Sequence, residues 1–486
     1  MSEYIPTIGL EIHSELKTRT KMFCSSKNDA NETRPNVNIC PICMAHPGTL
    51  PVINAEAVKS VLRVGVALGA TLADYTEFDR KNYFYPDLPK GYQLSQYEYP
   101  LVSGGELNGI AITRIHLEED TASSVHTEDP STSSGQGGVT TIDYNRAGVP
   151  LMELVTEPVI TSAKQAGDFA RELQLLLRTL GASDANMEKG EMRVEANVSV
   201  SKGNQLGTKV EIKNLNSFRA MERAVEYEIK RQTALLERGE KVVQETRGWD
   251  ESKQSTFVQR VKEGSADYRY FPDPDLPSLK LSELPEYSEE TLRKSLPELP
   301  RERRSRYLAL GVKGEDTELY MREPMLGAFF EGVIAGFKGD KSRVVLASNY
   351  IANDLVALLR DDEKRDTDYR ANMPISARNF SKVIEMLSER KISSRAAKGI
   401  LAESVKSGRD PEEVARSENL YQMSAGSDFE AVVRSTLATN PSVVADYRAG
   451  KLAALEYLVG QSMKATKGAA DPSTLRELTL KLIKEA

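Results

Sequence analysis

The sequence predicts an α+β protein, in which an N-terminal half built on an antiparallel sheet is followed by an all-helical half. Up to about residue 292, short segments of alternating hydrophobicity are separated by Gly, Pro, Asn and Asp, a pattern typical of strands and turns. Beyond Pro300 this alternation ends, and apolar residues recur at helical spacing. A chain of 486 residues is long enough for about three domains. We expect them to span 1–292, 293–410 and 411–486, the last being a small helical module.

The composition is that of a globular protein, with 40 % apolar and 28 % charged residues, which excludes a disordered or fibrous chain. No stretch of about 18 apolar residues could cross a membrane, so we expect no membrane partner. The first residues have neither the basic nor the apolar region of a secretory signal. Three cysteines are too few for a disulfide framework. We therefore expect a cytoplasmic protein.

The formal net charge of −7 would by itself disfavour nucleic-acid binding. The acidity is local, however, because residues 101–200 carry 7 basic and 15 acidic side chains. Residues 1–292 carry 32 basic and 43 acidic side chains, whereas residues 293–486 carry 32 and 28. This distribution is compatible with an acidic site in the first half and with nucleic-acid binding in the second.

Two long helices are expected to interrupt the strands of the first half. One runs from Ser162 to about Leu180 with Gly181 as its stop, and the other starts near Asn216 or Ser217 and ends before Gly239. Short amphipathic helices are expected in the second half at Leu326–Phe337, Arg343–Leu359, Ser376–Ser388, Ser393–Ser407 and Phe429–Thr436. The other expectations are a linker at Phe271–Pro300, a flexible loop at Asp129–Gly138 and a solvated charged loop at Asp361–Asp368.

Three segments of the first half place polar side chains on one face of an otherwise apolar strand, because successive side chains of a strand point to opposite faces. The polar face of Ile8–Leu16 carries Glu11, His13 and Glu15. Those of Arg193–Val200 and Lys209–Asn214 carry Arg193, Glu195, Asn197 and Ser199, and then Lys209, Glu211 and Lys213. For any one of these strands, the solvated face of an antiparallel sheet is the simpler interpretation.

A fourth acidic segment, Ile115–Asp120, differs because neighbouring carboxylates fall on opposite faces. His116, Glu118 and Asp120 share one face, and Glu119 lies on the other with Ile115 and Leu117. A carboxylate on the apolar side is costly to bury without a partner. We therefore expect Glu119 to meet a cation.

The accumulation of these acidic faces favours a metal–phosphate site. Oxygen ligands with one imidazole suit Mg²⁺ or Mn²⁺, and interleaved Lys and Arg suit a phosphate-bearing substrate. The sequence contains no G-x-x-x-x-G-K-[ST] loop, no G-x-S-x-G turn and no H-E-x-x-H pair, so the commonest nucleotide-binding and hydrolase motifs are excluded. The candidate ligands are Glu11, His13, Glu119, Glu195 and Glu211.

Longer motifs resemble the B subunit of the aspartyl/glutamyl-tRNA amidotransferases (the GatB family). They are Gly9–Leu16, Phe78–Asp87, Leu117–Asp120, Glu195–Asn197, Glu211–Ser217, Asp267–Pro272 and Val459–Ala465. The resemblance runs from Ile8 to the C-terminus, without the inserted domain of the archaeal paralogue. It implies a cradle domain with an ATP site of the glutamine synthetase type, followed by helical and tail domains that hold tRNA.

The resemblance also implies a tRNA-dependent kinase and transamidase. With ATP and Mg²⁺, the family phosphorylates the side-chain carboxylate of Asp-tRNA(Asn) or Glu-tRNA(Gln) and replaces the phosphate with ammonia, giving Asn-tRNA or Gln-tRNA. The ammonia comes from an amidase-type glutaminase (the A component), and a small C component completes a heterotrimer. The alternative is a non-catalytic tRNA-binding scaffold that positions a partner amidotransferase, although a scaffold needs no carboxylate cluster.

Residue roles follow from the resemblance by position. It implies that His13, Glu119 and Glu211 are the Mg²⁺ ligands. It places Glu11, Glu153, Glu195 and Lys213 in or beside the catalytic site, and Arg193, Asn197 and Asn214 beside the nucleotide or substrate. Lys213 and Arg193 could balance the γ-phosphate or form surface ion pairs. Asn216 could orient the substrate or cap the helix that begins there.

The cysteines depart from the family pattern of C-x-C followed by C-x-x-C, which is a tetrahedral zinc site. Ser26 replaces the second ligand, which leaves Cys24, Cys40 and Cys43. His46 stands where relatives have an apolar residue, and we hypothesise that it completes a Cys₃His zinc site. The alternative is a cluster that binds no metal.

Basic residues of the second half are the candidates for tRNA binding, because Lys and Arg grip phosphates without reading bases. They are Lys464 and Lys467 in the tail and Arg390, Lys391, Arg395 and Lys398 on a preceding helical segment. Solvated helix faces are the alternative interpretation.

Overall fold

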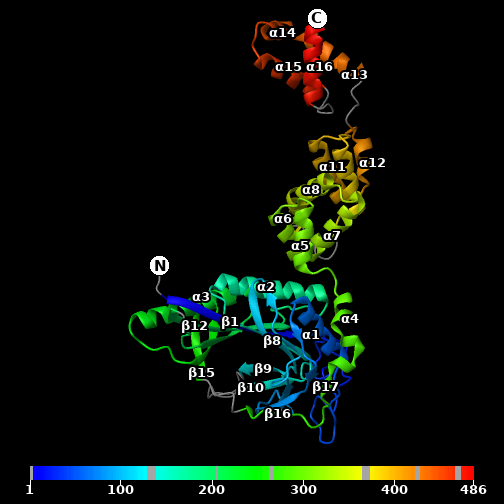
Figure 1. Ribbon diagram of the computed structural model, residues 1–486. Helices are drawn as coiled ribbons and strands as arrows, with labels where there is room; N and C mark the ends of the chain where they lie inside the picture. Colours follow the sequence, from blue (N-terminus) through cyan, green and yellow to red (C-terminus); the bar gives the residue numbers. More distant parts are fainter. Residues whose placement is uncertain are drawn as a thin grey trace. The chain divides into compact units, whose positions relative to one another are not determined.

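The structure is a computed structural model that describes residues 4–128, 138–203, 205–261, 268–363, 373–421, 427–465 and 472–485. It divides into two compact units, 1–300 and 301–486, each of which is described by itself (Figure 1). The predicted loop at Asp129–Gly138 lies almost entirely outside the described residues, as do most of Asp361–Asp368 and Lys467. The division into three domains stays a prediction.

The first unit is built on a ten-stranded sheet, which confirms the predicted α+β class. All its pairings are antiparallel except that of β13 with β14. The strand order is β15 (Ser255–Val261), β14 (Glu245–Asp250), β13 (Val210–Leu215), β12 (Met192–Lys202), β1 (Tyr4–Glu15), β11 (Pro150–Thr156), β8 (Ile110–Glu119), β6 (Val102–Ser103) and β2 (Thr71–Leu72), with β7 (Glu106–Leu107) paired to β8.

Helices cover one face of this sheet, as Figure 1 shows for α2 (Ala163–Leu180) and α3 (Phe218–Glu237). Both helices confirm the sequence prediction. The side chain of Ser162 caps α2, Gly181 ends it at a left-handed φ of 66°, and Ser217 rather than Asn216 caps α3. Apolar side chains of β1, β8 and β12 pack with these helices in one core that includes Ile8, Leu10, Ile12, Ile115, Leu117, Phe169, Leu173, Val194 and Met221.

The structure differs from the sequence predictions at two places in the first unit. A third helix, α1 (Ala55–Ala67), was not predicted, and its residues are buried around much of its circumference. Phe271–Pro300 is not a linker, because Leu276, Leu281, Leu292 and Leu299 belong to the core of the unit. That stretch forms β16 (Phe271–Pro272), β17 (Leu279–Lys280), two short 3₁₀ turns and α4 (Glu289–Lys294).

Three small sheets complete the first unit. In one of them, β4 (Asp79–Asn82) lies between β5 (Tyr92–Ser95) and β16. The others pair β9 (Ser123–Glu128) with β10 (Gly138–Asp143) and β3 (Tyr75–Thr76) with β17. The β4–β5–β16 sheet matters for the site below, because β5 leads directly to side chains that contact β8.

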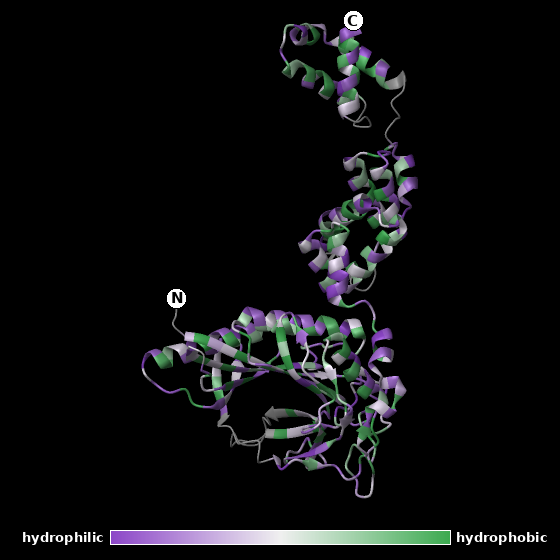
Figure 2. Cartoon of the chain, viewed as in Figure 1, coloured by the Kyte–Doolittle hydropathy of each residue, from purple (hydrophilic) through white to green (hydrophobic). Residues whose placement is uncertain are grey.

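The described elements of the second unit are helices, apart from one isolated bridge between Ile392 and Tyr421, and Figure 2 shows hydrophobic and hydrophilic residues alternating along the helices. The five predicted helical segments are all present, with a π-helical stretch, Tyr350–Leu355, inside the second. No described helix of the chain has the length and apolar character needed to cross a membrane. The helices are α5 (Pro300–Ala309), α6 (Gly314–Arg322), α7 (Pro324–Ile334), α8 (Lys341–Asn349), α9 (Val356–Glu363), α10 (Ala377–Ser388), α11 (Ser394–Ser407), α12 (Pro411–Ser417), α13 (Ser427–Thr439), α14 (Pro441–Arg448), α15 (Ala453–Ala465) and α16 (Pro472–Glu485).

Candidate functional site

The strand register brings the predicted polar faces together on the side of the sheet opposite the apolar core. On β1, Glu11 lies directly opposite Glu195 of β12, and His13 lies opposite Glu153 of β11. Glu153 in turn lies opposite His116 of β8. Like charges directly opposite one another are unfavourable in an antiparallel pair, so the Glu11–Glu195 pairing calls for a cation between them.

The side chains of these strands form a compact group, here called the His13 cluster, made of Glu11, His13, His116, Glu118, Glu153 and Glu195. His13 Nε2 lies 3.3 Å from Glu153 Oε2, 3.6 Å from Glu118 Oε1 and 3.9 Å from Glu11 Oε1. Within the cluster, two sets of three ligand atoms lie within 4.8 Å of one another, namely those of Glu11–His13–Glu195 and His13–Glu118–Glu153. The predicted alternation therefore assembles sites with the size and donor set of a metal centre.

The charges of this cluster shift its protonation strongly. Burial alone would lower the pKa of His13, but the hydrogen bond and charge of Glu153, with the charges of Glu118 and Glu11, raise this pKa to about 9. Burial opposes ionisation of Glu153, yet His116 and His13 hold its pKa well below the usual range. His13 is therefore protonated at neutral pH and occupies the centre of the carboxylates as a cation.

Glu11 and Glu195 form the other side of the cluster. Burial, followed by the charges of Glu153 and Glu195, raises the pKa of Glu11 to about 6. Lys213 of β13 contacts Glu195 Oε1 at 2.8 Å, which places it beside this end of the cluster. Among the described residues, Glu195 Oε2 and Asn197 Oδ1 are buried without a hydrogen-bond partner. Two buried oxygens in need of a donor or a cation point into this end of the site.

A second charged group lies at the end of β8. Arg193 Nη2 contacts Asp120 Oδ2 at 2.6 Å, and Arg146 Nε lies 3.7 Å from the same oxygen. These arginines outweigh burial and lower the pKa of Asp120. Burial and the neighbouring Asp120 raise the pKa of Glu15 to about 8. Arg193 is thus paired with the buried Asp120, while 37 % of its own side chain is exposed.

The structure does not bring the three Mg²⁺ ligands implied by the resemblance into one group. His13 belongs to the cluster, but Glu119 turns to the opposite face of β8, where Lys90 Nζ contacts it at 2.6 Å. The prediction that Glu119 meets a cation is confirmed. Glu211 accepts a hydrogen bond from Thr246 Oγ1 at 2.7 Å and is absent from the groups around His13. The assignment of Glu119 and Glu211 as ligands stays a prediction.

Several residues of the site were missed from the sequence. Glu118 and His116 contribute to the cluster directly, and Arg114 Nη2 lies 3.4 Å from Glu153 Oε1. The alternation of β8 already placed Glu118 and His116 on one face, so the missing information was that β8 pairs with β11. Asn214, a predicted substrate contact, is exposed and has a left-handed φ of 61°.

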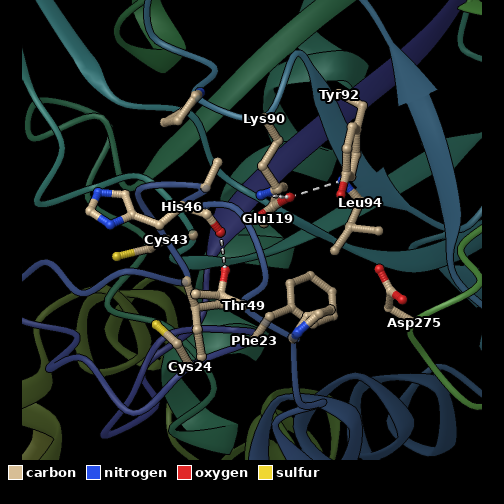
Figure 3. A pocket seen from close by; sticks show the side chains of 15 residues that line it. Phe23, Cys24, Cys43, His46, Thr49, Lys90, Tyr92, Leu94, Glu119 and Asp275 are labelled. Atoms are coloured by element: carbon tan, nitrogen blue, oxygen red, sulfur yellow. Dashed lines mark hydrogen bonds and ion pairs between the residues drawn. The ribbon is translucent and has the colours of Figure 1, made fainter.

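The cysteines lie beside Glu119, on the face away from the His13 cluster. The sulfur atoms of Cys24, Cys40 and Cys43 lie within 4.8 Å of one another, whereas His46 is exposed and is not part of that group. Lys21 Nζ lies 3.7 Å from Cys43 Sγ. Cys24, Cys43 and His46 line a cavity of about 200 Å³ together with Lys90 and Glu119. Figure 3 shows these side chains. Three thiols suit zinc, and both the zinc ion and its fourth ligand stay predictions.

The basic residues predicted to contact tRNA lie on the surface of the second unit. Lys391 pairs with Glu389 at 2.8 Å, and Lys398 pairs with Asp354 at 2.6 Å. Arg390, Arg395 and Lys464 are exposed. Their role in tRNA binding stays a prediction.

Comparison with known proteins identifies the family of the chain. Residues 6–285 match the family described as GatB/GatE catalytic domain, and residues 328–483 match the GatB domain family. The aspartyl/glutamyl-tRNA(Asn/Gln) amidotransferase B subunits of Thermus thermophilus and Carboxydothermus hydrogenoformans are 44 % and 42 % identical to the chain, over 99 % and 98 % of both sequences. The chain belongs to the GatB family. This membership confirms the resemblance found in the sequence motifs.

A third relative carries an organellar name. The chloroplastic/mitochondrial glutamyl-tRNA(Gln) amidotransferase B subunit of Physcomitrium patens is 41 % identical over 98 % of this chain and 85 % of its own length. The catalytic-domain match of the GatB family contains every residue of the His13 cluster. The site built from the strand register therefore lies in the part of the chain that the family description calls catalytic.

Proposed function

We propose that this chain catalyses the ATP-dependent amidation of a side-chain carboxylate on Asp-tRNA(Asn) or Glu-tRNA(Gln), giving Asn-tRNA or Gln-tRNA. The observation that carries the proposal is the His13 cluster, which gathers four carboxylates and two histidines on the polar face of the catalytic-domain sheet. Membership in the GatB family supports this substrate class.

The donor set of the cluster fits Mg²⁺. The carboxylates of Glu11, Glu118, Glu153 and Glu195 supply oxygen ligands, and His13 supplies one nitrogen after it loses its proton. The buried oxygen of Glu195 that has no hydrogen-bond partner in the described chain supports a bound cation. When bound, ATP would supply the γ-phosphate, and Mg²⁺ would offset the negative charge that builds up during its transfer.

The cationic residues at the edges of the cluster suit the phosphate groups. Lys213 on β13 and Arg193 on β12 flank the carboxylates, and each is already held by an acidic partner, Glu195 and Asp120 respectively. These partners fix the direction of the two cations before substrate binds, so that less side-chain freedom is lost on binding. We assign both residues to the phosphate oxygens, and Asn197 to the substrate.

The reaction follows from the chemistry of a carboxylate. An oxygen of the substrate carboxylate attacks the γ-phosphorus of ATP and ADP leaves, which gives an acyl phosphate. Ammonia then attacks the carbonyl carbon, phosphate leaves with the bond electrons, and a proton is lost from the nitrogen. A carboxylate is a poor electrophile until one oxygen becomes a phosphate leaving group, so the phosphorylation must precede the amidation. We assign the side chains around His13 to positioning the substrate carboxylate against the γ-phosphate.

The proposal includes partner proteins, a location in the cell and a zinc ion. An amidase-type glutaminase (the A component) would supply ammonia, and a small C component would complete a heterotrimer in the cytoplasm. The second unit would hold the body of the tRNA through its exposed basic residues. Cys24, Cys40 and Cys43 would bind zinc as a structural ion, with His46 moving to complete the four ligands.

The phosphorylation step can be tested without ammonia. The full-length chain, purified with the proteins that co-purify with it, is incubated with Glu-tRNA(Gln), ATP and hydroxylamine, which converts the side-chain acyl phosphate to a γ-hydroxamate. Hydroxylamine also cleaves the aminoacyl ester to an α-hydroxamate without enzyme, so the γ-hydroxamate is separated from it by chromatography. Wild type should form the γ-hydroxamate only when ATP is present, and Glu153→Gln should form it about 10- to 100-fold more slowly, because a partner of His13 and the metal is lost. Glu157→Gln, a change in a partly exposed residue that follows β11 outside the cluster, is the matched control. Absence of γ-hydroxamate with wild type, or equal rates in both variants, would overturn the proposal.

A further inference from the structure

Five tyrosine rings follow one another across the first unit, in the order Tyr85, Tyr83, Tyr268, Tyr270 and Tyr97; they are called the tyrosine row below. Successive ring centroids lie 5.9, 6.0, 6.0 and 4.3 Å apart. The last pair, Tyr270 and Tyr97, is stacked with only 14° between the ring planes. The two ends of the row are open, since Tyr85 is 56 % and Tyr97 is 53 % exposed.

The row passes beside the His13 cluster. Tyr97 follows β5 by two residues, and Ser95, the last residue of β5, donates a hydrogen bond to Glu118 Oε2 at 3.3 Å. The backbone N–H of Tyr97 donates to Asp79 Oδ2 at 2.9 Å, which fixes the start of the loop that carries this ring. The exposed end of the stack is therefore anchored to the β4–β5 pair, which also contacts the cluster.

Cations are interleaved with the rings. Lys81 Nζ lies 5.2 Å from the centroid of Tyr268. Burial lowers the pKa of Lys81 and raises that of Tyr270, and the nearby charges of Glu118 and Glu153 raise the pKa of both. Arg269, between two tyrosines of the row, is exposed. Aromatic faces alternating with Lys and Arg are the usual surface for unpaired nucleotides, whose bases stack on the rings while the cations meet the phosphates.

We propose that the tyrosine row binds the unpaired 3′ end of the aminoacyl-tRNA, with the terminal base stacked on the exposed face of Tyr97. The inference rests on the proposed function, because the amino acid is joined to the ribose of that terminal nucleotide. The carboxylate to be phosphorylated is only a few covalent bonds from this ribose. If the carboxylate reacts at the His13 cluster, the terminal base must lie on the surface next to it, where Tyr97 extends a stack already formed with Tyr270.

The same surface chemistry could accept the adenine of ATP, or the rings could bury against a partner protein. The covalent link favours the tRNA, since it fixes the distance between the base and the reacting carboxylate. The test must therefore distinguish these three occupants.

The experiment compares two forms of one uncharged tRNA(Gln), intact or lacking only the 3′-terminal adenosine. The full-length chain with its co-purifying proteins is titrated with each form, and the dissociation constants are measured by fluorescence anisotropy. Wild type should bind the intact form about tenfold more tightly, the contribution expected for one stacked base. In Tyr97→Ala and in the double variant Tyr97→Ala/Tyr270→Ala, the two forms should bind equally. Tyr97→Phe keeps the ring and should keep the preference.

Tyr75→Ala is the matched control, because Tyr75 is 40 % exposed in the same unit but pairs with Tyr99 outside the row. The inference is overturned if Tyr97→Ala retains the full preference for the intact end. It is also overturned if this variant raises only KM for ATP, or loses only its co-purifying proteins. Because the assay uses uncharged tRNA and no ATP, a wild type that shows the preference but forms no γ-hydroxamate would refute the proposed reaction and leave the binding result standing.

Discussion

The two faces of strand β8 place neighbouring carboxylates in different surroundings. Glu118 joins the His13 cluster, where carboxylates from several strands meet two histidines. Glu119, the next residue, turns away and is held by Lys90 at 2.6 Å and by the backbone N–H of Leu94 at 3.0 Å. Both carboxylates are buried, at 2 % and 3 % exposure. Burial of an acid therefore does not identify a ligand; what distinguishes the Glu118 face is that its acids face one another.

The largest effect is expected on the Glu119 face. Lys90→Met should lower the free energy of unfolding of the first unit by about 3–5 kcal/mol, because it leaves Glu119 charged and buried without its cation. Urea unfolding can be followed through Trp249, the single tryptophan of the chain, which lies on β14 of the same sheet. Lys164→Met, which breaks the exposed Lys164–Asp168 pair, should cost less than about 1 kcal/mol.

Adding Glu119→Gln to Lys90→Met separates charge from packing. The double variant should recover a large part of the lost stability, since no unpaired carboxylate remains buried. A loss below about 1 kcal/mol in Lys90→Met would show that the Lys90–Glu119 contact behaves as a surface pair. The contrast between the two faces of β8 would then be wrong.

A smaller effect should distinguish the two faces by metal affinity. Glu153→Gln should weaken Mn²⁺ binding about 10- to 100-fold, measured by electron paramagnetic resonance of the free ion, because a carboxylate beside His13 is lost. Glu119→Gln should leave the Mn²⁺ affinity unchanged, since Glu119 faces Lys90. Equal weakening in both variants would show that Glu119 is a ligand, as the sequence resemblance implies.

The sequence predicted which side chains share a face of each strand, but not which strands lie next to one another in the site. Alternation on β1 and β12 correctly separated Ile8, Leu10 and Ile12 from Glu11 and His13, because a one-residue error would bury charges in the core. It could not tell that Glu153 lies between His13 and His116, since that depends on which strands are neighbours. Strand order is set by contacts between residues far apart in the chain, which no local pattern contains.

The helices also show what local sequence patterns can and cannot predict. Ser162 and Gly181 mark both ends of α2, because caps and left-handed stops are local chemistry. Helix α1 was not predicted and Phe271–Pro300 was wrongly predicted to be a linker, because the structure of both depends on burial against the sheet core. Whether His46 joins the cysteine group likewise depends on the direction of its side chain, which residue spacing does not predict.

The smallest predicted effect concerns the proton on His13. Without metal, its pKa should be about 9, and Glu153→Gln should lower it by about one unit or more, because the hydrogen bond and charge of Glu153 are the first of the interactions that raise it. The chain has four histidines, so ¹³C-labelled histidine and NMR titration can resolve His13, with its assignment checked by His13→Gln. Asp168→Asn, at an exposed pair on α2, should leave the titration unchanged.

The sign of the effect on stability follows from that pKa. A histidine raised from its usual 6.5 to about 9 contributes stability that is fully present below pH 6.5 and is lost as the pH rises through 9. Because Glu153→Gln lowers the pKa of His13 in the folded protein, this stability should be lost at a lower pH than in wild type. Because His13 must lose its proton before its nitrogen can bind a cation, Mg²⁺ should be taken up with release of a proton at neutral pH. Isothermal calorimetry in buffers of different ionisation enthalpy measures that proton; if none is released in wild type, His13 binds no metal.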